Sequence, residues 1–283
     1  MNTDIFSIIK TSMNGFTKGE KKVAQYVLAH PAEVMNMSIS DLSDECGTGD
    51  TTVFRFCRTL NLNGYQDFKM RLAQSVSMVQ QPGNIEDEAR HGDGINWVCK
   101  QTLENNIAAL NETYSLLDLK KIEQAVTYIS QARIIRFFGL GASYLSAQEA
   151  HYKFLRITDN TSCVMDSHFQ TMAASLMTEE DVAVLFTHSG SSKDAIQILD
   201  TLQKTGCRII SITRFKKSPA TERSDIVLLC GDNETPLQGG STSARIAQLY
   251  IIDVIYNEYC RQNPQKTARN RVATSSSITD KLL

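Results

Sequence analysis

The chain has 283 residues and a net charge of −2 at pH 7, so it is long enough for two domains with separate cores. It has no apolar run of 18 residues and no signal-peptide segment near its start, so we expect a cytoplasmic protein without a membrane partner. Seven cysteines, an odd number without a C-x-x-C pair, are typical of a reducing compartment. The five histidines show no spacing with acids or cysteines that suggests a metal site. We therefore expect no metal and no cofactor.

The first part of the chain predicts several short helices. Residues 18–29 place Val23, Tyr26 and Val27 on one helical face, and Pro31 is suited to begin a second short helix. Two more helices are predicted over 38–46 and 50–60, separated by the turn Gly47-Thr-Gly. Their predicted buried residues are Ile39, Leu42 and Cys46, then Val53, Phe56 or Cys57, and Leu60. Two short helices joined by such a turn match the helix-turn-helix motif.

The second of these helices carries polar residues suited to DNA. Arginine can bond guanine edges, and threonine can meet bases or phosphates. Residues 1–50 carry four bases and seven acids, whereas residues 51–77 carry four bases and one acid, so positive charge coincides with this helix and the next. An ordinary helical bundle with solvated arginines is an equally good interpretation of the pattern alone. The candidate DNA-binding residues are Asp50, Thr51, Thr52, Arg55, Arg58 and Lys69.

Residues 1–77 resemble the helix-turn-helix domain of the RpiR family of bacterial transcription regulators. The matching motifs are Thr17-x-x-Glu-Lys-Lys-Val-Ala-x-Tyr-Val-Leu, the run from Ser38 to Gly47, Thr52-Val-Phe-Arg-Phe-Cys-Arg58 and Gly64-Tyr-x-x-Phe-Lys69. The chain departs from the family pattern at Gly49 and Asp50, where Ser-Glu is usual. Glycine is a tolerable N-cap and aspartate suits the helix dipole, so the helix should form, but its local DNA contacts are expected to differ.

A linker and a long helix follow this domain. Residues 78–94 are polar and rich in glycine, as linkers are. Residues 95–132 predict connecting helices: a long one over 95–117 and another that Asp118 caps. The first has a near-heptad apolar stripe, which packs either in a core or against a second subunit, and the sequence leaves both open. The stripe consists of Leu103, Ile107, Leu110, Tyr114 and Leu117.

Two strands of the second half end in loops suited to an anion. The strand predicted over 133–138 leads into Gly139-Leu-Gly141-Ala-Ser143 and then a helix. A dinucleotide fingerprint would require a third glycine where Tyr144 stands, so NAD binding is not expected. The apolar run Val182–Phe186 leads into Thr187-His-Ser-Gly-Ser-Ser192 and a further helix. A helix N-terminus crowded with hydroxyls favours phosphate, although Ser192 would also serve as a simple cap.

Residues 120–262 resemble the SIS (sugar isomerase) phosphosugar-binding domain. Three loops match in order: the two above and Gly239-Gly-Ser-Thr-Ser-Ala-Arg245. The chain departs from the usual form at Thr187 and Ser192, and both keep a hydroxyl group. The resemblance implies a sugar phosphate as ligand. The implied phosphosugar-binding residues are Ser143, Thr187, His188, Ser189, Ser192, Ser241, Ser243 and Arg245.

The alternation of strands and helices predicts an α/β fold for residues 133–262, a three-layer α/β/α sandwich with a mainly parallel five-stranded sheet. The sugar phosphate is expected over the carboxyl ends of the first and third strands. The polar tail, 263–283, is expected to be disordered. The predicted strands cover 133–138, 161–165, 181–187, 208–213 and 226–230.

RpiR regulators join these two domains, so the resemblance implies a DNA-binding transcriptional regulator of carbohydrate metabolism. Its expected partners are operator DNA, a sugar-phosphate effector, amino-sugar or other, and a second copy of the chain in a homodimer or homotetramer. The alternative is a phosphosugar isomerase, because SIS domains also catalyse aldose–ketose exchange. An isomerase needs a general base, for which only Glu234 and His188 are attractive, and a DNA-binding domain has no purpose on it. We therefore expect no enzymatic activity.

Overall fold

The computed structural model describes residues 4–79, 94–232, 234 and 242–279. The chain divides into two compact units, with residues up to 105 in the first and residues 106–233 and 240–283 in the second. The linker predicted over 78–94 falls mainly outside the described residues. No helix in the described ranges combines the length and apolar character needed to span a bilayer.

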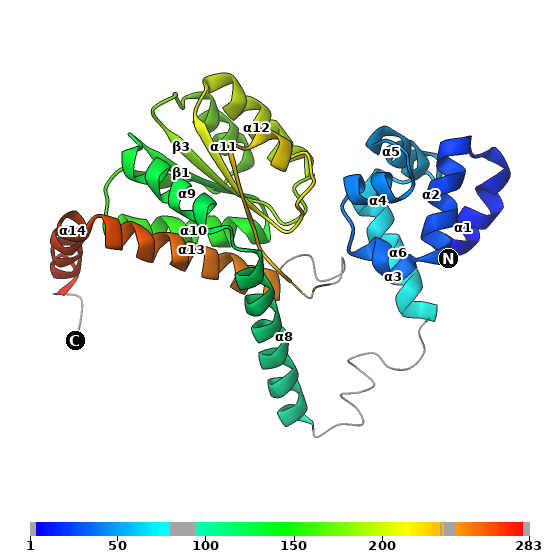
Figure 1. Cartoon of the computed structure of the whole chain (residues 1–283), viewed down its shortest axis with the longest axis horizontal. Helices are drawn as coiled ribbons and strands as arrows, with labels where there is room; N and C mark the ends of the chain where they lie inside the picture. The colour runs from blue at the N-terminus through cyan, green and yellow to red at the C-terminus, as the bar shows by residue number, and fades with distance from the viewer. Residues whose placement is uncertain (1–3, 80–93, 233, 235–241, 280–283) are drawn as a thin grey trace. The chain divides into compact units, whose positions relative to one another are not determined.

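The first unit is built of short helices, as the sequence predicts (Figure 1). The residues of the predicted buried faces lie in one core, and both Phe56 and Cys57 are buried in it. Phe56 packs edge-on against Phe68 of the last helix, with ring centroids 5.5 Å apart. The elements are α1 (Ile5–Ser12), η1 (Met13–Gly15), α2 (Lys18–Ala29), α3 (Pro31–Met35), α4 (Ile39–Glu45), α5 (Asp50–Thr59) and α6 (Tyr65–Val79).

Reciprocal caps fix where α2 and α4 begin. The Thr17 hydroxyl accepts a bond from the Glu20 backbone N–H, and the Glu20 carboxylate accepts one from the Thr17 N–H. Ser38 and Asp41 form the same capping box at α4. The other oxygen of Glu20 accepts a bond from the Thr59 hydroxyl at 2.9 Å. A single carboxylate therefore starts α2 and ties it to the end of α5.

The second unit contains a parallel sheet between two layers of helices (Figure 1). Helices α9, α10 and α13 pack on one face of the sheet, and α11 and α12 pack on the other. Its strands are β1 (Ile135–Gly139), β2 (Thr161–Cys163), β3 (Val182–Phe186), β4 (Arg208–Thr213) and β5 (Ile226–Leu229). The helices from residue 95 onward are α8 (Ile95–Leu116), α9 (Leu119–Gln131), α10 (Ala142–Leu155), α11 (Ser167–Ser175), α12 (Lys193–Thr205), η2 (Thr221–Arg223), α13 (Ser243–Gln262) and α14 (Pro264–Ser276).

The strand order β2-β1-β3-β4-β5 creates a topological switch point. From β1 the chain crosses to β2 on one side, and from β3 it crosses to β4 on the other side. The loops that leave β1 and β3 therefore diverge between two adjacent parallel strands, where Gly139 pairs with Phe186. Ligands of open α/β sheets bind at such a crevice. The predicted fold is confirmed, including all five strands, although four of them begin or end at different residues.

For two helices the structure adds to the sequence analysis: it bears on the open question of the α8 stripe, and it contradicts the expectation of a disordered tail. Most of the apolar stripe of α8 is not core, because Leu103, Ile107 and Tyr114 are 59%, 46% and 69% exposed. The tail is not disordered throughout, because residues 264–276 form α14. Thr274 and Asn270 of α14 donate to backbone carbonyls after α10, and Arg271 lies over a tyrosine ring of α13. Side-chain contacts with neighbouring helices thus order a polar sequence.

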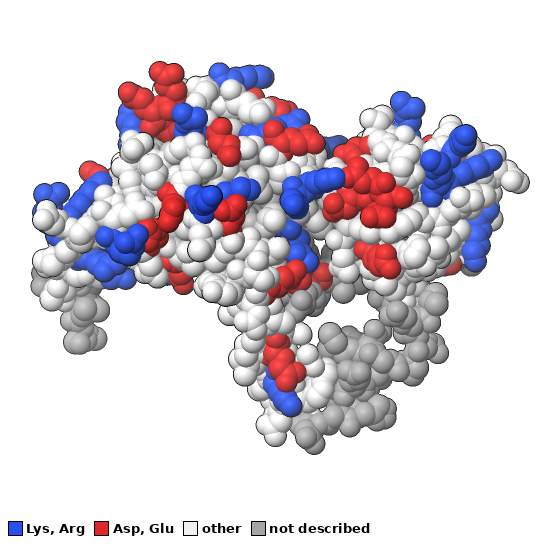
Figure 2. All heavy atoms as spheres, viewed as in Figure 1, with Lys and Arg blue, Asp and Glu red and all other residues white. Residues whose placement is uncertain are grey.

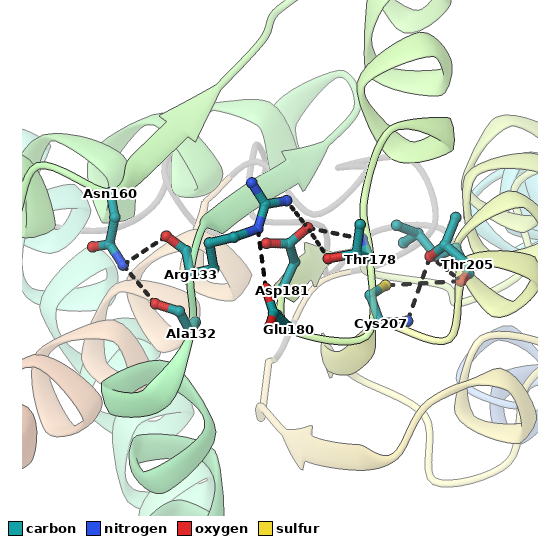
Figure 3. A network of polar contacts seen from close by, with 9 residues as sticks. Ala132, Arg133, Asn160, Thr178, Glu180, Asp181, Thr205 and Cys207 are labelled. Carbon is teal, nitrogen blue, oxygen red and sulfur yellow. Dashed lines mark hydrogen bonds and ion pairs between the residues drawn. The ribbon is translucent and has the colours of Figure 1, made fainter.

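Polar contacts secure the opposite, amino-terminal end of the sheet (Figure 3). Arg133 stands just before β1, outside the strand predicted to include it, and its guanidinium bonds the buried Asp181 carboxylate at 2.7 Å. The same carboxylate oxygen accepts bonds from the backbone and the hydroxyl of Thr178. Asn160 donates to the carbonyls of residues 132 and 133. These contacts fix the starts of β1 and β3, so both loops at the other end leave from a rigid base.

Replacement of Glu20 by glutamine should destabilise the first unit. Burial opposes ionisation of Glu20, but hydrogen bonds from Thr17 and Thr59 outweigh it and hold its pKa below the usual 4.5. The free energy of unfolding of the wild type should therefore exceed that of the variant by about 1–3 kcal/mol above pH 4.5. This difference should be lost as the pH falls through the lowered pKa of Glu20. Urea unfolding at several pH values measures it. The exposed Glu45→Gln is the control, and an equal effect of both variants would contradict the assignment.

Candidate functional site

The turn between α4 and α5 sets the geometry of the helix-turn-helix. Gly47 has φ +57, a left-handed conformation that favours glycine. Asp50 accepts hydrogen bonds from the hydroxyls of Ser40 and Ser43 at 2.7 and 2.6 Å. Asp50 was predicted to face DNA, but its carboxylate instead fastens the start of α5 to α4. It contributes to the site by fixing the angle between the two helices.

The outward face of α5 presents Thr51, Phe54, Arg55 and Arg58. All four are exposed, and their spacing of i, i+3, i+4 and i+7 places them on one stripe. Thr52 lies beside this stripe and packs toward α2. A Cβ added at Gly19 of α2 would stand only 2.8 Å from the methyl group of Thr52. The structure thus leaves Thr51, Arg55 and Arg58 on the exposed side, although Arg58 also donates to the Leu62 carbonyl at 3.4 Å, whereas Thr52 serves the close approach of α2 and α5.

Lys69 does not belong to this surface. Its side chain is 4% exposed, and its ammonium group donates to the Met37 carbonyl at 3.0 Å and lies 5.5 Å from the centre of the Tyr65 ring. Lys69 follows α5 closely in the sequence, but α6 directs its side chain toward the interior of the unit. Its charge is therefore paired with groups of the unit itself. Its assignment to the DNA-binding residues is therefore corrected.

One basic residue that sequence reasoning missed lies next to the turn. The ammonium of Lys22, on the exposed side of α2, is 3.7 Å from the position that a Cβ of Gly47 would occupy. No local pattern points to Lys22, because the apolar spacing of α2 marks only its buried face. On the face drawn in Figure 2, the basic and acidic side chains of the first unit gather in separate areas.

In the second unit, the loop after β1 is a tight turn. A Cβ at Gly139 would lie 2.4 Å from the Ser143 carbonyl oxygen, so no side chain fits there. Gly141 adopts φ +57 and ψ −129, and its C=O accepts the first bond of α10 from residue 144. Buried Gln170 of α11 bonds both the N–H and the C=O of Gly139. Ser143 is thereby held in the first turn of α10, where backbone N–H groups point outward.

The loop after β3 is cross-braced by its own hydroxyls. The Thr187 hydroxyl accepts a bond from the Gly190 N–H, and the Ser189 hydroxyl accepts one from the Ser191 N–H. Ser192 caps α12 by accepting from the Ala195 N–H at 3.4 Å, as its simpler interpretation predicts. A hydroxyl that accepts a bond keeps its own proton to donate. The cap and a phosphate contact are therefore compatible.

His188 is held by groups that the sequence analysis did not assign to the site. Its Nε2 lies 2.7 Å from the carboxylate of Asp232, which follows β5, and its carbonyl accepts bonds from Thr213 and from the N–H of Arg214. The Arg214 guanidinium lies 3.4 Å from the same Asp232 oxygen. Arg214 and Asp232 follow the carboxyl ends of their strands, as His188 does. Residues in such positions meet at one edge of a parallel sheet, and this placement could have identified both as candidates for the site.

The third predicted loop is described only in part. Ser241 lies outside the described residues. Ser243 is buried in the first turn of α13, and Arg245, two residues later in the same turn, is partly exposed. Helices α10 and α13 run side by side in the same direction, since Ser146 bonds Gln248 and Lys153 bonds Asp253 further along. Their N-terminal turns, with Ser143 and Ser243, therefore lie at the same end, above the switch point.

A helix-turn-helix unit followed by a sheet with an anion-suited switch point defines a transcriptional regulator of two domains. The profile of the helix-turn-helix domain, rpiR family, matches residues 3–79, and that of the SIS domain matches residues 128–258. An HTH-type transcriptional regulator of Haemophilus influenzae is 32% identical over 93% of this chain and 95% of its own length. One from Caldanaerobacter subterraneus is 30% identical over 90% and 89%. The chain belongs to the rpiR family of HTH-type transcriptional regulators.

Solved structures agree with the fold. The NanR protein of Vibrio vulnificus, solved in complex with ManNAc-6P, superposes with a TM-score of 0.87 at 25% identity, covering 99% of this chain and all of that one. The sugar isomerase domain of an RpiR transcription factor from Sphaerobacter thermophilus covers 62% of this chain at a TM-score of 0.57 and 19% identity. The second likeness concerns the SIS fold alone.

The conformation of the loop after β3 requires glycine at position 190, and the stability of an alanine variant tests this requirement. Gly190 has φ +64, and an added Cβ would stand 2.2 Å from the Ser218 hydroxyl oxygen. Gly141 also has a positive φ but has open space around it. Both alanine variants should lose about 1 kcal/mol or more to backbone strain, and Gly190→Ala should lose more because Ser218 must move. Thermal unfolding compares them, and equal losses would contradict the packing argument.

Proposed function

We propose that this regulator binds operator DNA through α5 and that a sugar phosphate at the β1–β3 switch point controls its operator affinity. The observation that carries the proposal is the convergence of Ser143, the 187–192 loop and the first turn of α13 at one end of the sheet. Three helix N-termini there offer backbone N–H groups and positive dipole ends to a phosphate. Arg245 stands in the first turn of α13 and adds a cationic group near that end.

The similarity to NanR narrows the ligand class. That protein was solved with ManNAc-6P, and its chain matches this one over its full length. A phosphate monoester carries nearly two negative charges. Hydroxyl and amide groups alone neutralise this charge incompletely, so the positive dipole ends of the helices are required. Phosphorylated amino sugars are therefore the first ligands to test.

On the DNA side, the exposed stripe of α5 supplies the proposed contacts. Arg55 and Arg58 are suited to guanine edges or phosphates, and Thr51 stands near the N-terminal end of the helix, where recognition helices read bases. Lys22 beside the turn is suited to a phosphate. A two-fold symmetric operator requires two such units, so we propose a homodimer or a dimer of dimers.

We propose a regulator rather than an enzyme because the similar full-length proteins are named transcriptional regulators. Isomerisation remains the second candidate, since His188 has a carboxylate partner that would orient it as a base. Incubation with hexose 6-phosphates separates the two. Turnover supports an isomerase, whereas stoichiometric binding that alters DNA affinity supports the regulator.

The Arg55→Ala, Arg58→Ala double variant should lose operator affinity. Each arginine that reads a base edge contributes about 1–3 kcal/mol, so the dissociation constant should rise at least tenfold. A gel-shift or anisotropy titration measures it at fixed salt. Lys10→Ala, which removes an exposed charge from α1, is the control. Full operator affinity in the double variant would remove α5 from the interface.

Ser189→Ala and Ser143→Ala should each weaken effector binding. A hydrogen bond to a charged group contributes about 1.5–3 kcal/mol, so affinity for ManNAc-6P should fall roughly tenfold or more. Calorimetry and thermal shift with ManNAc-6P, glucose 6-phosphate and inorganic phosphate measure this. Operator affinity without effector should not change, and Ser175→Ala on the exposed side of α11 should behave as wild type. Unchanged affinity in the Ser189, Ser143 double variant would place the site elsewhere.

A further inference from the structure

A chain of polar side chains leads away from the 187–192 loop to residues outside the three predicted motifs. It begins at His188, whose Nε2 lies 2.7 Å from Asp232. Arg214 lies 3.4 Å from the same carboxylate oxygen and, through its Nη1, 2.8 Å from Glu112 of α8. We call His188, Asp232, Arg214 and Glu112 the polar chain. It connects the ends of β3, β4 and β5 with the C-terminal part of α8.

The end of the polar chain on α8 is fastened to the backbone as well. The second oxygen of Glu112 accepts a bond from the Asp232 N–H at 3.1 Å. The hydroxyl of Thr113, fully buried, accepts one from the Gly231 N–H at 2.9 Å and donates to a carbonyl one turn earlier in α8. A Cβ at Gly231 would stand 2.6 Å from the Glu112 carboxylate, so the close approach requires glycine. Helix α8 is thus positioned against the end of β5 by two adjacent residues.

The burial of Asp232 makes the pairing of these groups sensitive to a new charge. The Asp232 side chain is 6% exposed, and its partners include His188 and Arg214, which are 27% and 25% exposed. Charges that are largely removed from water interact more strongly than surface pairs, and the loss of one partner leaves the remaining charge poorly compensated. A phosphate that binds beside His188 competes with the Asp232 carboxylate for the imidazole of His188. Asp232 then depends more on Arg214, which Glu112 also holds.

We propose that Asp232, Arg214 and Glu112 are positioning residues that couple the effector site to α8. The proposal rests on the proposed function. Helix α8 begins at Ile95, next in sequence to the segment that joins the two domains, so a change in its position or stability passes along the covalent chain to the DNA-binding unit. Coupling of this kind changes operator affinity by a factor of about 5 to 150 in characterised allosteric proteins.

The full-length Glu112→Gln variant tests the proposal. Glutamine keeps an oxygen that can accept from the Asp232 N–H but removes the charge that holds Arg214. We expect the ratio of operator dissociation constants with and without saturating ManNAc-6P to move toward unity by a factor of at least about five, a range set by typical coupling factors. Affinity for ManNAc-6P should stay within about threefold of wild type, since Glu112 does not touch the proposed ligand.

Two further variants sharpen the result. Thr113→Val removes the second anchor of α8 at nearly constant volume and should also bring the ratio closer to unity. Glu104→Gln is the matched control on the same helix, since its carboxylate pairs only with exposed Lys100 at 3.8 Å in the described part of the chain. A wild-type ratio in both Glu112→Gln and Thr113→Val would overturn the inference.

The remaining outcomes distinguish this inference from the function on which it rests. A Glu112→Gln protein that regains the wild-type ratio at higher ManNAc-6P would place Glu112 in the binding site, and the coupling role would be wrong. If wild-type operator affinity does not respond to ManNAc-6P, glucose 6-phosphate or inorganic phosphate, the proposed function itself fails, and the coupling role fails with it.

Discussion

The second unit depends on one constraint, the parallel pairing of β1 with β3. Because both strands run the same way and their connections diverge, the loops after Gly139 and Phe186 must open at one edge of the sheet. Every feature of the proposed effector site follows from this pairing. It brings Ser143 and the 187–192 loop together although they are more than 40 residues apart in sequence, and it directs helix N-termini toward the same space.

The two ends of the sheet serve different purposes. At the amino-terminal end, Arg133, Asp181 and Asn160 satisfy backbone groups and fix the strands (Figure 3). At the carboxyl end, glycines and hydroxyls leave backbone N–H groups available, with His188 held by Asp232. Rigid pairing at one end allows the loops at the other end to keep a conformation suited to a ligand, including positive φ angles at Gly141 and Gly190.

The same hydroxyl and carboxylate chemistry organises the first unit. Glu20 and Asp41 close capping boxes, and Asp50 joins α4 to α5, so acidic side chains in this unit set helix ends and helix angles. This use explains why the net charge of the unit describes the proposed DNA-binding surface poorly. What matters is which basic side chains remain exposed: Arg55, Arg58 and Lys22 do, and Lys69 does not.

The sequence by itself determined the two domains, the five strands and the loops at the switch point, because helical spacing, buried runs and Gly–Ser loops are local signals. Only the tertiary structure decided the fate of individual polar residues. Lys69 and Asp50 turned inward, residues 264–276 of the tail formed α14, and most of the stripe of α8 stayed exposed. Glu112 and Arg214 carry no local signal of their pairing. Their meeting, 102 positions apart, depends on where separate elements pack, which periodicity does not encode.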